Sequence, residues 1–226
     1  YVLILSGDQL YQMDFAEMID NHVKNNADIS IATIPVGDRE APEFGILKTN
    51  AENDITSFIE KPAKDLLPEW VSDTGAAMQA QGRNYLASMG IYIFSRKLLF
   101  DLLENEKKEA TDFGKEIIPT SIEKYKVVSF QYDGYWTDIG NIYSFFEANL
   151  ALTLDLPHFN LFDNQRVVYS RARMLPPAKI SGTTLEKTVI AEGSIIAASR
   201  LENSVIGIRS RIGHGTTIVS SYIMGN

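Results

Sequence analysis

The beginning of the chain alternates continuous apolar runs with an amphipathic segment. The opening five residues (YVLIL) are apolar without alternation, which is typical of a strand buried on both faces of a parallel sheet, and Ile29–Val36 (ISIATIPV) is a second candidate for a buried strand. Between them, Asp14 is placed to cap a helix from Phe15 to about Asn25, with Ile19 and Val23 four residues apart on one face. A strand, a helix and a second strand predict a layered α/β domain.

Shorter apolar runs and amphipathic stretches continue this pattern, and we predict that the α/β domain spans residues 1–155. The expected strands are Ile46–Lys48, Ile55–Ile59, Ala87–Phe94 and Lys126–Tyr132. The expected helices are Arg96–Glu104, Asp112–Lys124 (with Asp112 as its cap) and Asn141–Leu154. The polar stretch Lys64–Asn84 is expected to be a long loop, and Tyr135–Gly140 is expected to be a turn.

The pattern changes after residue 155. Pro157, Pro176 and Pro177 indicate a linker over residues 156–179, with a strand expected at Val167–Tyr169. Residues 180–226 show no helical period, and aliphatic residues recur there every six positions instead. Such a six-residue period is typical of a β-helix, in which each hexad forms one flat face of a coil. The spacing slips near Leu201, and the recurring residues are Ile190, Ile196, Ile206, Ile212 and Ile218.

Composition and charge exclude several classes of function. The 226 residues are 45% hydrophobic and 22% charged, which is ordinary for a globular protein. Without cysteine, the chain has no disulfide, no thiolate metal site and no cysteine nucleophile. A net charge of −8 without a basic block argues against a nucleic-acid partner. No segment is long enough for a membrane helix, and the apolar start lacks the basic flank of a signal peptide, so we expect a cytoplasmic protein.

Two aspartates are the leading candidates for metal binding. Asp8 follows the first buried strand, where open α/β sheets place their ligands, and Asp138 lies just before a helix. Each is interpreted either as a turn or capping carboxylate or as a ligand of Mg²⁺, which takes only one or two protein carboxylates. If the two side chains meet, they form one divalent-ion site.

Other candidates are weaker when taken singly. Lys61 precedes Pro62 at a strand end and suits a cation that reaches a phosphate, although a solvated turn lysine is the commoner case. Gly90, after Ser88, allows either close approach of a ligand or a β-bulge. His214 would be the base of an acyltransferase built on hexapeptide coils, but no partner residue is evident.

Seven segments, taken together and in order, resemble one known family. They closely resemble glucose-1-phosphate adenylyltransferases, also called ADP-glucose pyrophosphorylases. The resemblance implies a Rossmann-like nucleotidyltransferase domain followed by a left-handed β-helix. The segments are LSGDQLYQMD (5–14), EFGILKT (43–49), FIEKPA (58–63), ASMGIYIF (87–94), DFGKEIIP (112–119), GYWTDIGNI (134–142) and LPPAK (175–179).

The resemblance implies a reaction and a set of site residues. ATP and glucose 1-phosphate would give ADP-glucose and pyrophosphate, with Mg²⁺ as cofactor and a homotetramer as the complete protein. Asp8 and Asp138 are implied as the metal ligands, with Asp8 and Lys61 catalytic. The residues implied to bind substrate are Gly45, Glu60, Lys61, Ser88 and Asp138. Asp112 and Lys115 match a family motif near the active site, without an assigned role.

The chain also departs from the family pattern. Gln9 stands where histidine is frequent, and Asn141 stands where threonine is usual. The family's glycine-rich loop for the nucleoside triphosphate does not precede Tyr1, so we expect an internal fragment, truncated at both ends and inactive by itself. Two alternatives remain open: another sugar-1-phosphate nucleotidyltransferase, or a non-catalytic regulatory subunit of the same fold.

Overall fold

The computed structural model describes residues 1–225, which form two compact units. The first unit comprises Tyr1–Gly7 and Met13–Gly134. The second comprises Asp8–Gln12 and the residues from Tyr135 onward. A short early segment therefore belongs with the second unit. None of the described helices is both long and apolar enough to span a membrane.

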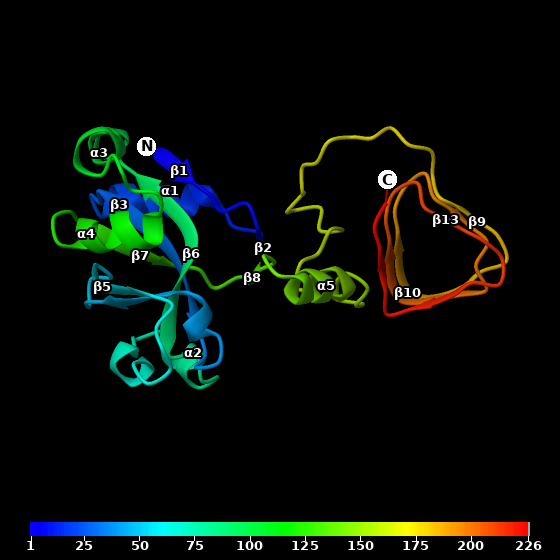
Figure 1. Cartoon of the computed structure of the whole chain (residues 1–226), viewed down its shortest axis with the longest axis horizontal. Coiled ribbons are helices and arrows are strands. Elements are labelled where there is room, and N and C mark those ends of the chain that lie inside the picture. The colour runs from blue at the N-terminus through cyan, green and yellow to red at the C-terminus, as the bar shows by residue number, and fades with distance from the viewer. Residues whose placement is uncertain (226) are drawn as a thin grey trace. The chain divides into compact units, whose positions relative to one another are not determined.

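The first unit is built on a six-stranded sheet in the order β5-β4-β6-β3-β7, with β1 also paired to β6. Only β3 and β7 are parallel; the other pairs are antiparallel. The strands are β1 (Val2–Ile4), β3 (Ile29–Val36), β4 (Gly45–Thr49), β5 (Ile55–Glu60), β6 (Tyr85–Phe94) and β7 (Val127–Gln131). The prediction that the first strand lies buried in a parallel sheet is wrong, because β1 is half-buried and antiparallel to the end of the long strand β6 (Figure 1).

Helix α1 (Phe15–Lys24) begins at the predicted cap, where the Asp14 carboxylate accepts the Ala16 N–H at 2.8 Å. Its buried face is not the face that carries both Ile19 and Val23. Met18 and His22 are buried, whereas Val23 is 48% exposed. Residue pairs at 18/22 and 19/23 have the same spacing, so the helical period alone does not select the face that packs on the sheet.

The remaining helical segments of the first unit are short. The predicted helix 96–104 is α3 (Arg96–Asp101) continued by the π-helical turn η3 (Leu102–Glu106). The predicted helix 112–124 begins as the π-helical turn η4 (Phe113–Ile117) and continues as α4 (Ile118–Ile122). The expected loop over 64–84 contains η2 (Leu67–Trp70) and α2 (Ala76–Gln79), and η1 (Ala41–Glu43) precedes β4.

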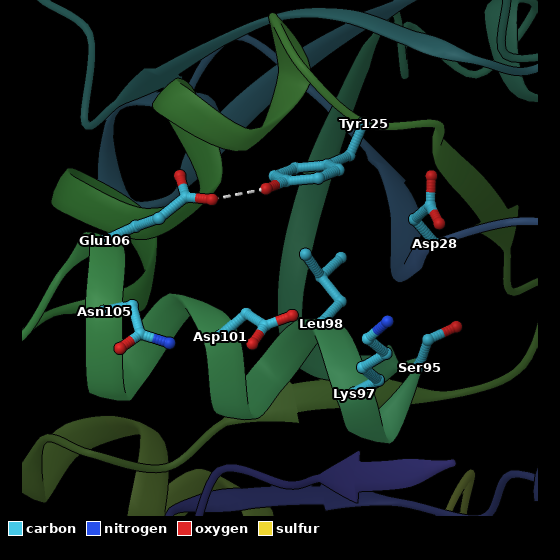
Figure 2. Close-up of a pocket in the computed structure, with 8 residues that line it drawn as sticks. All are labelled: Asp28, Ser95, Lys97, Leu98, Asp101, Asn105, Glu106 and Tyr125. Carbon is cyan, nitrogen blue, oxygen red and sulfur yellow. Dashed lines mark hydrogen bonds between the residues drawn. The ribbon is translucent and has the colours of Figure 1, made fainter.

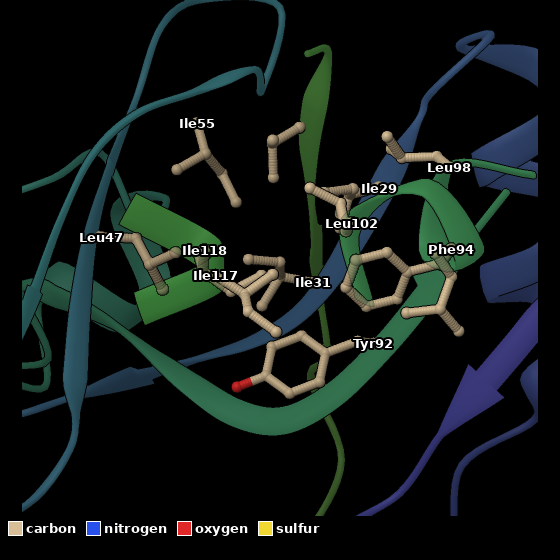
Figure 3. Close-up of a cluster of buried hydrophobic side chains, with 12 residues drawn as sticks. Ile29, Ile31, Leu47, Ile55, Tyr92, Phe94, Leu98, Leu102, Ile117 and Ile118 are labelled. Carbon is tan, nitrogen blue, oxygen red and sulfur yellow. The ribbon is translucent and has the colours of Figure 1, made fainter. Parts of the chain in front are cut away.

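The apolar core of the first unit lies between the sheet and these short helices. Figure 3 shows the cluster, in which the hydroxyl of Tyr92 is the one polar side-chain atom drawn. Burial of this many large aliphatic side chains, at about 1.5–3 kcal/mol each, is what holds the helical turns on the sheet. The members of this buried cluster include Ile29, Ile31, Leu47, Phe94, Leu102, Ile117 and Ile118.

The second unit begins with a two-stranded ribbon formed by β2 (Gln9–Tyr11) and β8 (Trp136–Asp138). The expected turn over 135–140 therefore contains a strand, whose distant partner leaves no local signal in the sequence. Helix α5 (Ile142–Ala151) follows, and the Asn141 side chain caps it by accepting the Ser144 N–H at 2.9 Å. Asparagine thus serves as a helix cap at the position where the family resemblance leads us to expect threonine.

A parallel β-helix begins at residue 179, after an irregular segment that follows α5. Each strand pairs with one sixteen or seventeen residues further on, such as Ile195 with Arg211 and Arg200 with Thr217. In Figure 1 the coils are seen nearly end-on, with β10 on one side and β9 and β13 on another. The strands are β9 (Lys179–Ile180), β10 (Thr184–Ile190), β11 (Ile195–Ile196), β12 (Arg200–Ile206), β13 (Arg211–Ile212), β14 (Thr217–Val219) and β15 (Tyr222–Ile223).

The predicted six-residue repeat is confirmed by the core of this β-helix. All five recurring isoleucines belong to one cluster, and Leu201, where the spacing slips, is fully buried within it. The strand expected at Val167–Tyr169 is wrong, because this segment has no regular structure and the Tyr169 side chain is 93% exposed. A short β-branched run forms a strand only where a partner strand is available.

Candidate functional site

The β2–β8 ribbon brings two of the predicted site residues together. Its register places Gln9 opposite Asp138, and the Ile139 N–H donates to the Asp8 carbonyl at 2.9 Å. A β-carbon built on Gly140 would lie 3.0 Å from Asp138 Oδ1 and 3.1 Å from Asp8 Oδ2. The two carboxylates therefore converge on the same glycine, from strands more than a hundred residues apart in the sequence.

This acidic pair (Asp8 and Asp138) fits a divalent ion. The distances to Gly140 limit the separation of the two oxygens to their sum, about 6 Å, and two oxygens bound to one Mg²⁺ at about 2.1 Å lie at most about 4 Å apart. Asp8 is exposed and Asp138 is half-buried, so side-chain rotation can supply the difference. No group of three or more metal-ligating side chains exists among residues 1–225, and Mg²⁺ needs only one or two carboxylates beside water and phosphate.

The acidic pair also has a structural role. Asp138 Oδ1 accepts the Gly140 N–H at 2.7 Å, which is the local turn contact that aspartate commonly makes. This bond orients the carboxylate and leaves its other oxygen for further ligands. The turn interpretation of Asp138 is therefore confirmed, and its role as a metal ligand stays a prediction that this contact does not oppose.

A second group of predicted residues lies in the first unit, around Glu60. Gly45 on β4 is paired with Glu60 on β5, and a β-carbon at Gly45 would collide with the Phe58 ring and lie 2.8 Å from Glu60 Oε2. A β-carbon at Gly114 would lie 3.1 Å from Glu60 Oε2 and 3.4 Å from Asp112 Oδ1. The Glu60 and Asp112 carboxylates therefore both lie beside Gly114, and the absence of a side chain at Gly45 makes room for the Phe58 ring and for Glu60.

The charges in this Glu60 cluster oppose one another. Burial raises the pKa of Glu60; the neighbouring Asp112 also raises it, and Lys61 and Lys115 lower it. The Lys115 ammonium lies 4.0 Å from Asp112 Oδ2, with both side chains largely exposed. Two carboxylates and two ammonium groups thus share one region, which suits a ligand that carries both hydroxyls and a phosphate.

Lys61 is held in an uncommon backbone conformation. Its φ of 48° is in the left-handed region, and its N–H donates to the Phe44 carbonyl at 3.0 Å. Residues without glycine's freedom adopt this region at a cost of about 1–3 kcal/mol, and such conformations cluster at functional sites. The side chain is exposed, and the strained turn fixes the direction in which it leaves strand β5.

Ser88 joins the same group through Tyr92. The Ser88 side chain hydrogen-bonds to Tyr92 and lowers the pKa of that phenol, while burial, the larger influence, raises it. Gly90, with a φ of 67°, lies where the pairing of β6 with β3 shifts register, so its bulge interpretation is confirmed. The Tyr92 ring stacks on Phe113, with centroids 5.9 Å apart. Sequence reasoning gave Tyr92 and Phe113 no role, and only the DFGK segment pointed toward Phe113.

The predicted site residues therefore form two groups. Asp8 and Asp138 belong to the second unit, and Gly45, Glu60, Lys61 and Ser88 belong to the first.

The open cavities of the first unit are lined mostly by other residues. One of about 470 Å³ contains no predicted site residue. Figure 2 shows its Glu106 accepting the Tyr125 hydroxyl; this bond is 2.6 Å long, and Lys124 donates to the same carboxylate at 2.8 Å. Because its strongest polar contacts are internal, this cavity is not our candidate site. Its lining residues are Asp28, Ser95, Lys97, Leu98, Asp101, Asn105, Glu106 and Tyr125.

Comparison with protein families assigns both parts of the chain. The family model for nucleotidyl transferase matches residues 1–154, and the model for the GLGC left-handed parallel beta-helix domain matches residues 173–226. The chain therefore belongs to the nucleotidyl transferase family. Its two domains together support transfer of a nucleotidyl group to a sugar 1-phosphate in general. The predicted fold class, an α/β nucleotidyltransferase domain followed by a left-handed β-helix, is confirmed.

Proposed function

We propose that this chain belongs to an enzyme that transfers the adenylyl group of ATP to α-D-glucose 1-phosphate, giving ADP-glucose and pyrophosphate. The observation that carries the proposal is the convergence of Asp8 and Asp138 on Gly140 in a member of the nucleotidyl transferase family. The choice of ATP and glucose rests on the resemblance of three segments: GDQLYQMD, DFGKEIIP and LPPAK.

Asp8 and Asp138 would hold the Mg²⁺ ion through one carboxylate oxygen each. When bound, the ion neutralises phosphate charge and polarises the phosphoryl oxygens. The hydrogen bond from Gly140 to Asp138 fixes one ligand in advance, and the missing side chain of Gly140 keeps space between the carboxylates. Such preorganisation lowers the cost of ordering the ligands during the reaction.

The Glu60 cluster would bind the sugar phosphate. The Glu60 carboxylate accepts hydrogen bonds from sugar hydroxyls, and Lys61 places a point charge beside the phosphate. Gly45 contributes through its missing side chain, because the Phe58 ring and Glu60 occupy the space that a β-carbon would need. Ser88 adds a hydroxyl that is already oriented by its bond to Tyr92.

The chemistry requires no protein nucleophile. A phosphate oxygen of glucose 1-phosphate attacks the α-phosphorus of ATP, and the bond from that phosphorus to the β-phosphate bridging oxygen breaks and releases pyrophosphate. The residues of this chain contribute by holding the phosphate in line and by neutralising the charge that develops. The absence of cysteine from this chain is therefore compatible with this reaction.

A substrate panel tests the proposal. The complete gene product is incubated with ATP, GTP, dTTP or UTP, and with glucose 1-phosphate or mannose 1-phosphate, and pyrophosphate release is measured. We expect the fastest turnover with ATP and glucose 1-phosphate. Faster turnover with another pair would assign a different sugar nucleotide. An Asp8→Asn variant with unchanged turnover would overturn the role of Asp8, and no turnover with any pair would indicate a non-catalytic, regulatory chain.

A further inference from the structure

The turn that places Asp112 beside Glu60 is stabilised by the exposed side chain of Glu116. Glu116 Oε2 accepts the Thr111 N–H at 2.6 Å and the Asp112 N–H at 3.3 Å. In the opposite direction, Asp112 Oδ1 accepts the Lys115 N–H at 3.0 Å. These reciprocal bonds satisfy backbone donors at the start of a helical segment, where no intrahelical acceptor exists.

This turn needs such support because of its geometry. Residues Phe113–Ile117 form a π-helical turn, and the Ile118 N–H bonds to the Phe113 carbonyl five residues back. Isolated π-helical turns are rare, and they occur frequently at functional sites. The bonds that Glu116 accepts lie just before this turn, so they hold the backbone from which the turn starts.

The same turn provides one wall of the Glu60 cluster. It places Asp112 and Gly114 against Glu60, and it stacks the Phe113 ring on Tyr92. Glu116 itself is exposed and lines a separate cavity of about 650 Å³, together with Lys115. Its carboxylate therefore acts on the cluster through the backbone of Thr111 and Asp112.

We propose that Glu116 is a positioning residue for the sugar-phosphate site, because its carboxylate fixes the turn that sets Asp112 and Gly114 against Glu60. This inference rests on the proposed binding of a sugar phosphate at the Glu60 cluster. One oxygen of Glu116 accepts both N–H groups, so a neutral amide oxygen can take over the role. The charge of Glu116 is then dispensable, and its acceptor oxygen is not.

Calorimetric titration of the 226-residue chain with glucose 1-phosphate tests this inference. We expect Glu116→Ala to weaken binding about ten- to hundredfold, because displacements of about 1 Å at a binding group have effects of this size. Glu116→Gln should bind within about twofold of the unchanged chain, since its amide oxygen accepts the same N–H groups. Glu109→Ala is the matched control: it removes an exposed carboxylate from the same cavity and should leave binding unchanged.

Two further measurements separate positioning from a general loss of structure. Glu116→Ala should raise the hydrogen-exchange rate of the backbone amides of residues 111–115. The exchange rate of the β3 amides should stay as it is in the unchanged chain. The affinity of the acidic pair for Mn²⁺ should also remain unchanged, because that pair belongs to the other unit.

The outcomes are distinct. Glu116→Ala binding as tightly as the unchanged chain would overturn the role of Glu116 alone. Equal losses for the Gln and Ala variants, or faster exchange throughout β3, would overturn it as well. No binding of glucose 1-phosphate by the unchanged chain would instead overturn the proposed sugar-phosphate site, and the role of Glu116 with it.

Discussion

Replacing Gly140 by alanine tests the acidic pair while keeping both carboxylates. The added methyl group would lie 3.0 Å from Asp138 Oδ1 and 3.1 Å from Asp8 Oδ2, both closer than ordinary van der Waals contact. Each carboxylate must move by a few tenths of an ångström, and the methyl group remains between them. Changes that reorient metal ligands typically weaken binding about ten- to a hundredfold, or about 1.4–2.7 kcal/mol.

The same substitution should not weaken the fold. Gly140 does not have a positive φ, so alanine is compatible with its backbone and restricts the unfolded chain. This effect stabilises proteins by about 0.4–1 kcal/mol. Metal affinity and folding stability should therefore change in opposite directions.

Titration with Mn²⁺, followed by electron paramagnetic resonance, measures the affinity without substrate. Gly7→Ala is the matched control, because it neighbours Asp8 and an added β-carbon there meets no atom within 4 Å. We expect tenfold or weaker binding in Gly140→Ala and no change in Gly7→Ala. Equal affinity in all three chains, or equal losses in both variants, would refute the role assigned to Gly140.

Three further substitutions test the fold and the Glu60 cluster. Gly45→Ala should destabilise the chain by about 1–3 kcal/mol in urea unfolding, because its β-carbon overlaps the Phe58 ring; a loss below 0.5 kcal/mol would contradict this packing. The raised pKa of Glu60 means that the folded state binds its proton more tightly, so stability should fall as pH rises from 4.5 through that pKa. In thermal melts over the same pH range, Glu60→Gln should lack this fall in stability. A stability profile identical to that of the unchanged chain would count against the burial of Glu60. Asp14→Ala should cost about 1 kcal/mol by leaving the Ala16 N–H without its cap, whereas no shift in the urea midpoint would assign the helix start to packing alone.

Local patterns in the sequence predicted much of the fold. The bounds of β3, Ile29–Val36, agree with the predicted buried strand, because most of its residues are apolar, and its buried Ser30 and Thr33 have hydrogen-bond partners. The cap at Asp14 and the isoleucines of the β-helix also follow from short-range rules. The buried face of α1, the antiparallel pairing of β1 and the strand β8 depend on distant partners, and local patterns do not contain that information.

In the candidate site, too, some features follow from local sequence patterns and others depend on distant contacts. Residue type and position at strand ends singled out Asp8, Asp138 and Lys61, but only the β2–β8 register shows that the two aspartates meet. Tyr92 and Glu116 carry no motif that distinguishes them from packing or surface residues. Their significance comes from contacts across the fold with Ser88, Phe113 and the Thr111 backbone.

The most direct test of the central claim is anomalous diffraction from a crystal of the chain soaked with Mn²⁺ in place of Mg²⁺. We predict one strong peak within bonding distance of a carboxylate oxygen from Asp8 and of one from Asp138. A peak bound to only one of these aspartates, or manganese sites only elsewhere on the molecule, would contradict it.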